Sequence, residues 1–185
     1  MQGASRVFFY SQRATMHPTS NNTHAASPTL HLVCGKIASG KSTLTQRLAA
    51  QPCTVRISED DWLARLYPGQ ISSVDDYLVH AARLRLVVAP LCRQLLGAGV
   101  SVVLDFPANT PASRGWLREL AEQAGTPHIL HLLDVSDAEC KARLRRRNED
   151  GQHPFQTSEA QFDAITRHFV APDAAEGFHV IRVAS

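Results

Sequence analysis

Residues Gly35–Ser42, with the sequence GKIASGKS, decide how this chain folds, because they form a complete GxxxxGKS motif. The motif follows an apolar run at 29–34 and precedes Leu44, Leu48 and Ala49, whose spacing indicates one face of a helix. Glycines let such a turn curl until successive backbone N–H groups point inward, and the start of the helix adds positive potential. The pattern therefore predicts a loop that holds the phosphates of a nucleotide.

Each polar residue of the motif has a predicted task. Lys41 is expected to reach the β- and γ-phosphates of ATP, and Ser42 to place its hydroxyl on Mg²⁺. ATP and Mg²⁺ are therefore the expected cofactors. The residues expected to contact the nucleotide are Gly35, Lys36, Ile37, Ala38, Ser39, Gly40, Lys41, Ser42 and Thr43.

Length and composition indicate the class of protein. The chain has 185 residues, of which 44% are hydrophobic and 19% charged, and this suits one compact domain rather than two. No apolar run approaches the roughly 20 residues that a membrane helix needs, so a membrane is not an expected partner. Residues 1–28 are rich in Ser, Thr, Asn and Ala. We expect a disordered tail or a start codon assigned too early at this end, followed by one domain at 29–185.

Charge and cysteine content argue against further classes. The net charge is +2, and Arg6 and Arg13 account for it, because the rest of the chain balances. A general nucleic-acid binder is strongly basic, so this balance argues against a nucleic-acid partner. The four cysteines form no CxxC pair, which argues against a zinc site or a disulfide framework and favours a reducing, cytoplasmic location. The sequence does not indicate an oligomeric state.

Beyond residue 28, short β-branched runs alternate with longer helical patterns. Alternation of this kind is typical of a parallel sheet wrapped by helices. The predicted strands are 29–34, 54–58, 101–106, 128–135 and 179–183, and the predicted helices are 41–50, 73–97, 111–125, 136–148 and 158–169. We therefore predict an α/β fold with a five-stranded parallel sheet.

Three consecutive acids, Glu59, Asp60 and Asp61, follow the strand at 54–58. They lie at the carboxyl edge of the predicted sheet, where ligands bind in open α/β folds. An aspartate there can accept the proton of an attacking hydroxyl, although acids are also common in the first turn of a helix. We expect one of the three to act in this way and the other two to cap a helix.

Asp105 closes the apolar run of another strand and is the favoured partner of Ser42 in holding Mg²⁺. Asp134 follows a similar run and stays open as an alternative ligand. We nevertheless expect Asp134 and Asp137 to act mainly as helix caps.

Arginines end the predicted helix at 136–148, directly before a polar stretch. Cations near a helix C-terminus are favourable in themselves, so at least two are expected to face solvent only. Arg147, and after it Arg143, are expected to neutralise phosphate charge as a lid at about 146–158 closes over ATP.

Four stretches, GKIASGKS, ISEDDW, VVLDFPANTPASR and RLRRRN, together resemble small P-loop kinases of the predicted-kinase type. These are AAA family ATPases related to zeta toxins, chloramphenicol phosphotransferase and polynucleotide kinase domains. The resemblance covers residues 29–183, and only the first stretch is highly specific. It implies a three-layer P-loop NTPase fold with strand order 2-3-1-4-5 and a small lid.

The resemblance also implies roles for single residues. The proton-accepting aspartate falls on Asp60 ahead of Asp61, and Lys41, Arg143 and Arg147 would complete the catalytic set. The DFPANT stretch departs from the DAT or DG-type turn of many relatives, which weakens the inference about the acceptor. The implied acceptor contacts are Asp61, Asp105, Asn109 and Arg114.

The function predicted from these features is an ATP-dependent kinase that transfers the γ-phosphate of ATP to a hydroxyl of a small molecule. One alternative is an ATP-binding regulatory or switch NTPase without a phosphoryl acceptor. A weaker alternative is a nucleic-acid end kinase, which would need a basic groove and stacking aromatic residues.

Overall fold

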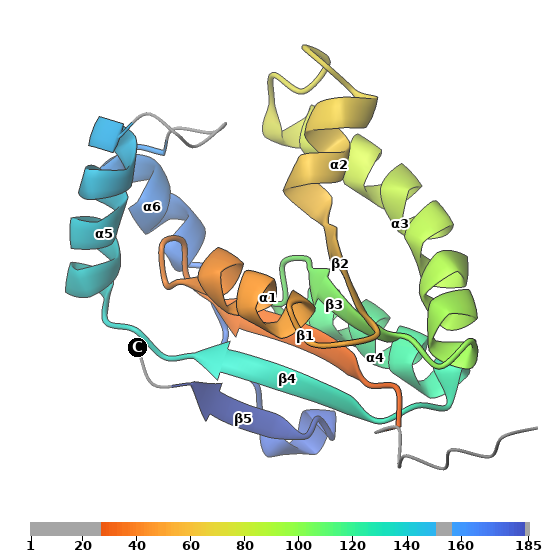
Figure 1. The fold of residues 1–185 in the computed structure, drawn as a ribbon. Coiled ribbons are helices and arrows are strands. Elements are labelled where there is room, and N and C mark those ends of the chain that lie inside the picture. Colours follow the sequence, from red (N-terminus) through yellow and green to blue (C-terminus); the bar gives the residue numbers. More distant parts are fainter. Residues whose placement is uncertain (1–26, 151–156, 184–185) are drawn as a thin grey trace, which may run out of the picture.

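The computed structural model describes residues 27–150 and 157–183, in which strands and helices alternate (Figure 1). The strands are β1 (Leu30–Gly35), β2 (Thr54–Ser58), β3 (Ser101–Asp105), β4 (His128–Leu133) and β5 (Val180–Val183). The helices are α1 (Lys41–Ala49), α2 (Glu59–Leu66), α3 (Val74–Gly97), α4 (Pro111–Ala124), α5 (Asp137–Asp150), α6 (Glu159–Thr166) and the short 3-10 helix η1 (Ala174–Glu176).

All five strands run parallel in one sheet with the order β2-β3-β1-β4-β5. This confirms the predicted fold class and strand order. The predicted strand bounds agree with the structure to within two residues. The main omission is α2, to which the sequence analysis gave no residue range, although it expected two of the acids after β2 to cap a helix. The predictions for 1–26 and for 151–156, at the centre of the expected lid, concern residues outside the described part of the chain.

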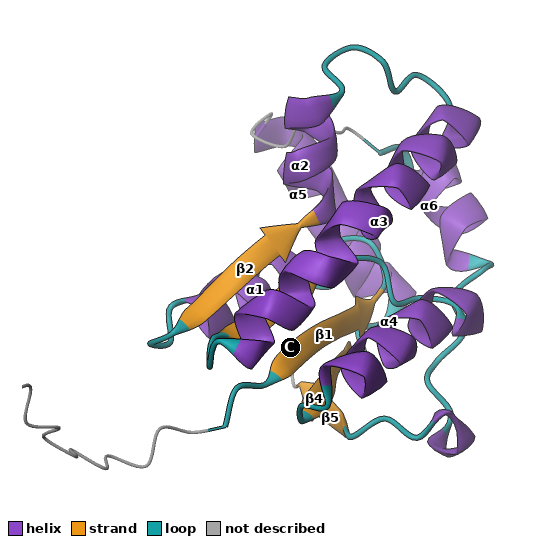
Figure 2. Ribbon diagram, turned by 90° about the vertical axis from the view of Figure 1, so that its right-hand side faces the viewer, coloured by secondary structure: helices purple, strands orange, loops and turns teal. Residues whose placement is uncertain are grey.

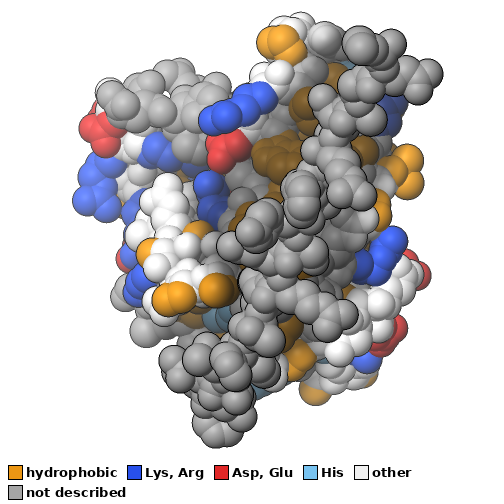
Figure 3. All heavy atoms as spheres, turned by 45° about the vertical axis from the view of Figure 1, so that its right-hand side comes forward, with side chains coloured by type: hydrophobic (Ala, Val, Ile, Leu, Met, Phe, Trp, Pro, Cys, Tyr) orange, Lys and Arg blue, Asp and Glu red, His pale blue; other side chains and the backbone are white. Residues whose placement is uncertain are grey.

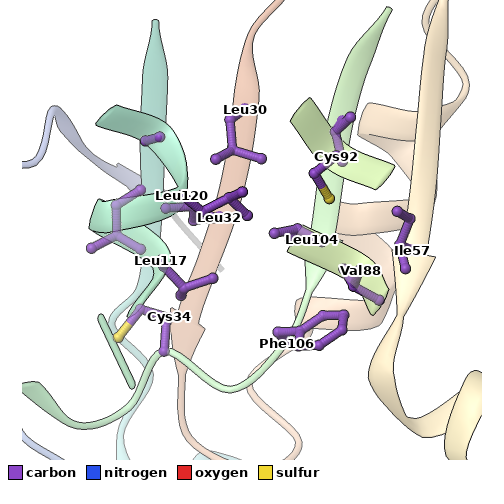
Figure 4. Packing of buried hydrophobic residues seen from close by; sticks show 14 of the residues in the cluster. Leu30, Leu32, Cys34, Ile57, Val88, Cys92, Leu104, Phe106, Leu117 and Leu120 are labelled. Carbon is purple, nitrogen blue, oxygen red and sulfur yellow. The ribbon is translucent and has the colours of Figure 1, made fainter. Parts of the chain in front are cut away.

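Two faces of the sheet are covered because alternate residues of each strand point to opposite sides. Leu30, Leu32 and Cys34 of β1 belong to the main core, where residues of α3 and α4 pack against them (Figure 4). Val33 points to the other face, into a cluster with Leu44 of α1. Each fully buried leucine contributes roughly 1.5–3 kcal/mol, so this alternation fixes the sheet between its two helical layers.

Helices stand on two sides beyond the carboxyl ends of the strands (Figure 1). α2 continues from β2 on one side of the loop between β1 and α1, and α5 with α6 stands on the other side. Figure 2 shows α3 and α4 on the same side of the sheet, and the two helices contact each other. The loop after β1 therefore lies between two helical walls.

Among the described residues, no helix combines the length and the apolar character needed to cross a membrane.

Candidate active site

Two glycines permit the sharp bend of the loop between β1 and α1. A Cβ atom on Gly35 would lie 2.6 Å from Ser39 Oγ and 3.1 Å from the carbonyl oxygen of Leu133, so no side chain fits there. Gly40 precedes α1 with φ 102°, a backbone conformation that favours glycine. The first N–H groups of a helix lack intrahelical partners, so this loop offers backbone donors to an anion.

Lys41 begins α1 and bends back over this loop. Its Nζ donates to the carbonyl oxygens of Gly35 and Lys36 at 2.8 and 2.7 Å. Burial lowers the pKa of the Lys41 ammonium, and the charges of nearby acids, Asp105 foremost, oppose that effect. Lys41 is thus a half-buried cation that contacts the loop and lines the pocket beside it.

α2 places two aspartates beside the loop. Ser58 is its N-cap, and Ser58 Oγ accepts a hydrogen bond from the backbone N–H of Asp61 at 3.3 Å. The N-cap itself is therefore a serine, while all three acids occupy the first turn of α2, the place that the sequence analysis gave to two of them. Backbone N–H groups in the first turn of a helix attract negatively charged groups, and Asp60 and Asp61 lie there, beside the loop.

The third acid, Glu59, is turned away from the loop and is buried. The hydroxyl of Tyr77 donates to Glu59 Oε2 at 2.5 Å, and Arg85 Nη2 lies 3.7 Å from Oε1. Burial raises the pKa of the Glu59 carboxyl, and the hydrogen bond from Tyr77 opposes that rise. Glu59 therefore joins α2 to α3.

Asp105 ends β3 with its carboxylate largely buried. Asp105 Oδ2 accepts hydrogen bonds from Thr45 Oγ1 at 3.0 Å and from Arg56 Nη2 at 2.6 Å. Arg56 also donates from Nη1 to Asp61 Oδ2 at 3.2 Å. One guanidinium thus joins the acid at the end of β3 to an acid of α2.

α5 brings arginines to the same region. Arg143 Nη1 donates to the backbone oxygen of Ser39 at 3.2 Å, and Arg143 also pairs with Glu139. Arg147 is half-buried, and its Nε is buried without a hydrogen-bond partner among the described residues. Burial lowers the pKa of Arg147, and the charge of Asp60 opposes this. An anion beside Arg147 would satisfy that orphaned donor.

These elements enclose a pocket of about 800 Å³. α1 and α5 supply most of its cations, whereas β3 and α2 supply its carboxylates. Figure 3 shows Lys or Arg side chains directly beside Asp or Glu side chains on the upper part of the molecule. The lining residues are Ile37, Ala38, Gly40, Lys41, Ser42, Thr43, Gln46, Arg56, Ser58, Asp60, Asp61, Asp105, Arg143, Arg146, Arg147 and Thr157.

The structure does not bring Asn109 and Arg114 to the lining of this pocket. Asn109 Oδ1 accepts a hydrogen bond from the backbone N–H of Gly35 at 3.0 Å. Asn109 therefore fixes the backbone at the start of the loop between β1 and α1. Arg114 has no exposed surface and pairs with Glu176. Its place is in the core, where an acceptor molecule does not reach it.

Two further predicted residues have other partners. Lys36 donates to the backbone oxygen of Val135 at 3.3 Å and pairs with Asp137.

The expectation of capping aspartates at the start of α5 is wrong. Ser136 Oγ accepts a hydrogen bond from the backbone N–H of Glu139 at 3.2 Å, whereas Asp134 pairs with Arg182 at 3.0 Å.

The sequence analysis missed several lining residues, of which Arg56 makes the most contacts with other site residues. The available signal was a charged residue one position before Ile57, in a strand that leads into the acid run. Arg146 could have been found from its place beside Arg147. Gln46 and Thr157 carry no comparable signal in the sequence.

The donor atoms in the pocket suit Mg²⁺, which prefers oxygen ligands. Ser42 and Asp105 both line the pocket, and Asp105 Oδ1 accepts no hydrogen bond from the described residues, whereas Oδ2 is occupied. A hydroxyl and one carboxylate oxygen are therefore the groups that would hold the ion.

Comparisons with solved structures show the same fold at low sequence identity. A candidate kinase from Chloroflexus aurantiacus is 21% identical with a TM-score of 0.66, and the match covers 85% of each chain. Kti12 from Chaetomium thermophilum, solved with ADP-AlF3, is 18% identical with a TM-score of 0.61, over 84% of this chain and 88% of that one. A sugar kinase from Janibacter is 18% identical with a TM-score of 0.57, over 84% of each chain.

No curated protein sequence matches the chain. A family profile does: AAA_33, described as an AAA domain, matches residues 30–172. The matched residues include the GKIASGKS loop, the acids of α2 and the arginines of α5. They span most of the described fold, and the structural neighbours share its parallel sheet. The chain therefore belongs to the AAA_33 family of P-loop AAA domains.

Proposed function

We propose that this protein is an ATP-dependent kinase that transfers the γ-phosphate of ATP to a hydroxyl of a small molecule. The observation that carries the proposal is the pocket itself, in which Asp60 and Asp61 share one cavity with the GKS loop and with Arg147. A nucleotide-binding loop alone would suit any NTPase. Carboxylates beside it add a group that can take a proton from an acceptor.

The reaction requires one proton transfer and one phosphoryl transfer. Asp60 accepts the proton of the acceptor hydroxyl while the oxygen forms a bond to the γ-phosphorus. The bond between that phosphorus and the bridging oxygen of ADP breaks, and ADP leaves with the electron pair. The proton then passes from Asp60 to solvent. Asp61, whose carboxylate accepts a hydrogen bond from Arg56, is the alternative base.

The cations of the pocket stabilise the charge that moves during transfer. Lys41 and the backbone N–H groups of the loop would hold the β- and γ-phosphates, while Arg147 and Arg143 would face the transferred group. Ser42 and Asp105 would hold Mg²⁺, which would supply positive charge against the negative charge of the phosphates. The described part of the chain thus contains the groups that phosphoryl transfer uses.

A small acceptor suits the lining better than a nucleic acid does. Proteins that bind single strands stack bases on aromatic side chains, and no aromatic residue lines the described pocket. The net charge of +2 is also far below that of a general nucleic-acid binder. A cytoplasmic site of action, where ATP is abundant, belongs to the same proposal.

The test is an acceptor screen with γ-labelled ATP across antibiotics, nucleosides, sugars and amino sugars. We expect Lys41→Ala and Asp60→Asn both to abolish transfer, and Asp60→Asn to keep nucleotide affinity. Asp75→Asn is the matched control, because Asp75 is an exposed aspartate in the first turn of α3. If Asp60→Asn transferred phosphate as fast as the native protein, a residue other than Asp60 would have to be the base.

A different result would favour the switch NTPase. ATP hydrolysis that no acceptor changes, together with hydrolysis retained by Asp60→Asn, would contradict the kinase proposal. Labelled RNA and DNA oligomers belong in the same screen, because transfer to their ends would support an end kinase instead.

A further inference from the structure

Arg56 joins three parts of the pocket with one side chain. Its Nε lies 3.1 Å from Thr45 Oγ1 of α1, and its Nη2 lies 2.6 Å from Asp105 Oδ2 of β3. Its Nη1 donates to Asp61 Oδ2 of α2 at 3.2 Å. The guanidinium therefore places one positive charge between two pocket carboxylates that come from different elements.

The sheet register explains this arrangement. Ile57 and Leu104 are paired in register and both point into the main core. Their strand neighbours Arg56 and Asp105 must then point to the opposite face, the one that α1 covers. Arg56 and Asp105 keep only 22% and 13% of their side-chain surface exposed, so water screens their attraction weakly.

This contact limits what Asp105 offers to a metal ion. Oδ2 is occupied by Arg56 and Thr45, which leaves Oδ1 for the pocket. A divalent cation approaching Oδ1 would also meet the positive charge of Arg56 a few ångströms away. Phosphate oxygens of a bound nucleotide would supply the negative charge that the paired carboxylates lack.

We propose that Arg56 is a positioning residue and an internal counterion, which fixes Asp105 and Asp61 and makes divalent-cation binding depend on the nucleotide. The inference rests on the nucleotide and magnesium site of the proposed function and goes beyond it. Without Arg56, the carboxylates of Asp105 and Asp61 would attract a cation by themselves.

The experiment measures the affinity of the full chain for Mn²⁺ alone, without nucleotide, by calorimetry or electron paramagnetic resonance. Mn²⁺ shares the oxygen-ligand preference of Mg²⁺ and is visible to resonance. We expect Arg56→Gln to bind Mn²⁺ about tenfold or more tightly than the native protein, because a nearby positive charge is removed. Arg56→Lys keeps the charge and should stay near the native affinity.

Arg83→Gln is the matched control, because Arg83 is exposed on α3 outside this pocket. Equal Mn²⁺ affinity of Arg56→Gln and the native protein would overturn the proposal. So would a gain of the same size in Arg56→Lys, because a retained charge should prevent it.

A further variant keeps the proposal testable if Arg56→Gln does not fold. Asp105→Asn in the native background should leave the weak affinity for Mn²⁺ alone unchanged and should lower the affinity measured with ADP present. A loss of affinity for Mn²⁺ alone would show that Asp105 attracts metal despite Arg56, against the proposal. None of these measurements uses an acceptor, so failure of the kinase proposal would be seen separately, in the acceptor screen.

Discussion

Arg114 of α4 and Glu176 of η1 form a two-pronged ion pair: Nε lies 2.5 Å from Oε2, and Nη2 lies 2.7 Å from Oε1. Arg114 Nη1 also donates to the backbone oxygens of Ala108 and Val170 at 3.0 and 2.8 Å. Burial acts to lower the pKa of Arg114, but the hydrogen bonds and charge of Glu176 outweigh it and raise this pKa. The pair ties the loop after β3 to the C-terminal segment.

Arg114→Met should therefore cost stability rather than acceptor affinity. Removing one partner of a buried pair leaves the other charge uncompensated, with a cost of about 3–5 kcal/mol. Urea unfolding followed by circular dichroism measures this cost. Arg93→Ala serves as the control, because Arg93 bonds Gln123 near the surface, and we expect it to cost less than about 1 kcal/mol.

A second measurement on Arg114→Met separates the two roles. Once the acceptor is known, its KM is compared at a temperature where the variant is folded. An unchanged KM agrees with the buried position of Arg114. If the variant were as stable as the native protein but had a much higher KM, the result would support the acceptor contact that the family resemblance implied for Arg114.

His31 and His131 should make stability depend on pH. His31 Nδ1 and His131 Nε2 are 3.1 Å apart on adjacent strands, in the cluster of side chains facing α1, and Arg47 adds a positive charge nearby. Burial lowers the pKa of both rings, that of His131 to about 4. Because the folded state favours the neutral rings, their contribution is complete above pH 6.5 and is lost as the pH falls toward 4.

The check is His131→Gln, which cannot titrate in this range. The native protein should lose stability between pH 6.5 and 4 by roughly 2–3 kcal/mol more than the variant does, as a shift of this size implies. His168→Gln controls for an exposed histidine. Parallel pH profiles of the native protein and His131→Gln would contradict this account.

Much of the fold could be predicted because local signals agree with one another. The GKIASGKS loop requires a strand before it and a helix after it, and both flanks have the right hydrophobic pattern. Apolar runs such as Val102–Leu104 are buried on both faces, which is why they could be read directly as parallel strands. The strand order came from the family resemblance and not from the runs themselves.

The rest depends on contacts between residues far apart in the sequence. The family resemblance assigned Arg114 to the acceptor. Its actual partner, Glu176, lies 62 positions away in the sequence, and no local pattern predicts that ion pair. Arg56 was overlooked because its importance appears only when β2 and β3 pair and bring Asp105 beside it. α2 was missed because its first turn is all acidic, a composition shared by caps and catalytic loops.

Glu59→Gln should gain in relative stability as the pH rises. The folded state raises the pKa of Glu59, mainly through burial, so the protonated form is favoured. The native protein then loses this contribution as the pH rises from 4.5 through the folded pKa, whereas the amide of glutamine stays neutral. The stability difference between variant and native protein should therefore move in favour of the variant from pH 4 to pH 8.

Urea midpoints at pH 4, 6 and 8 measure that difference, with the exposed Glu119→Gln on α4 as control. A difference that moves the opposite way would mean that the ion pair with Arg85 outweighs burial and that Glu59 is stabilised as a carboxylate.

Comparison of Arg147→Ala with Arg145→Ala should show that these two arginines of α5 have different roles. Arg147 lines the pocket, and its buried Nε has no hydrogen-bond partner among the residues that the structure describes. Arg145 on the same helix is 57% exposed and pairs with Glu159 outside the pocket. A donor aimed at developing phosphate charge is worth about a hundredfold or more in rate, so ATP turnover should fall by that factor in Arg147→Ala. A surface ion pair contributes about 1 kcal/mol or less, so Arg145→Ala should fold and turn over ATP nearly as the native chain does.

Binding and turnover must be measured separately for Arg147→Ala. A fluorescent ATP analogue reports affinity, which should weaken by less than about tenfold, because in the proposed site Lys41 and the loop N–H groups would still hold the phosphates. Steady-state release of phosphate reports turnover. If affinity and turnover fell by the same factor, Arg147 would act in holding ATP and not in the transfer step. If Arg145→Ala fell as far as Arg147→Ala, the orphaned donor would not explain the effect, and the general positive potential of α5 would.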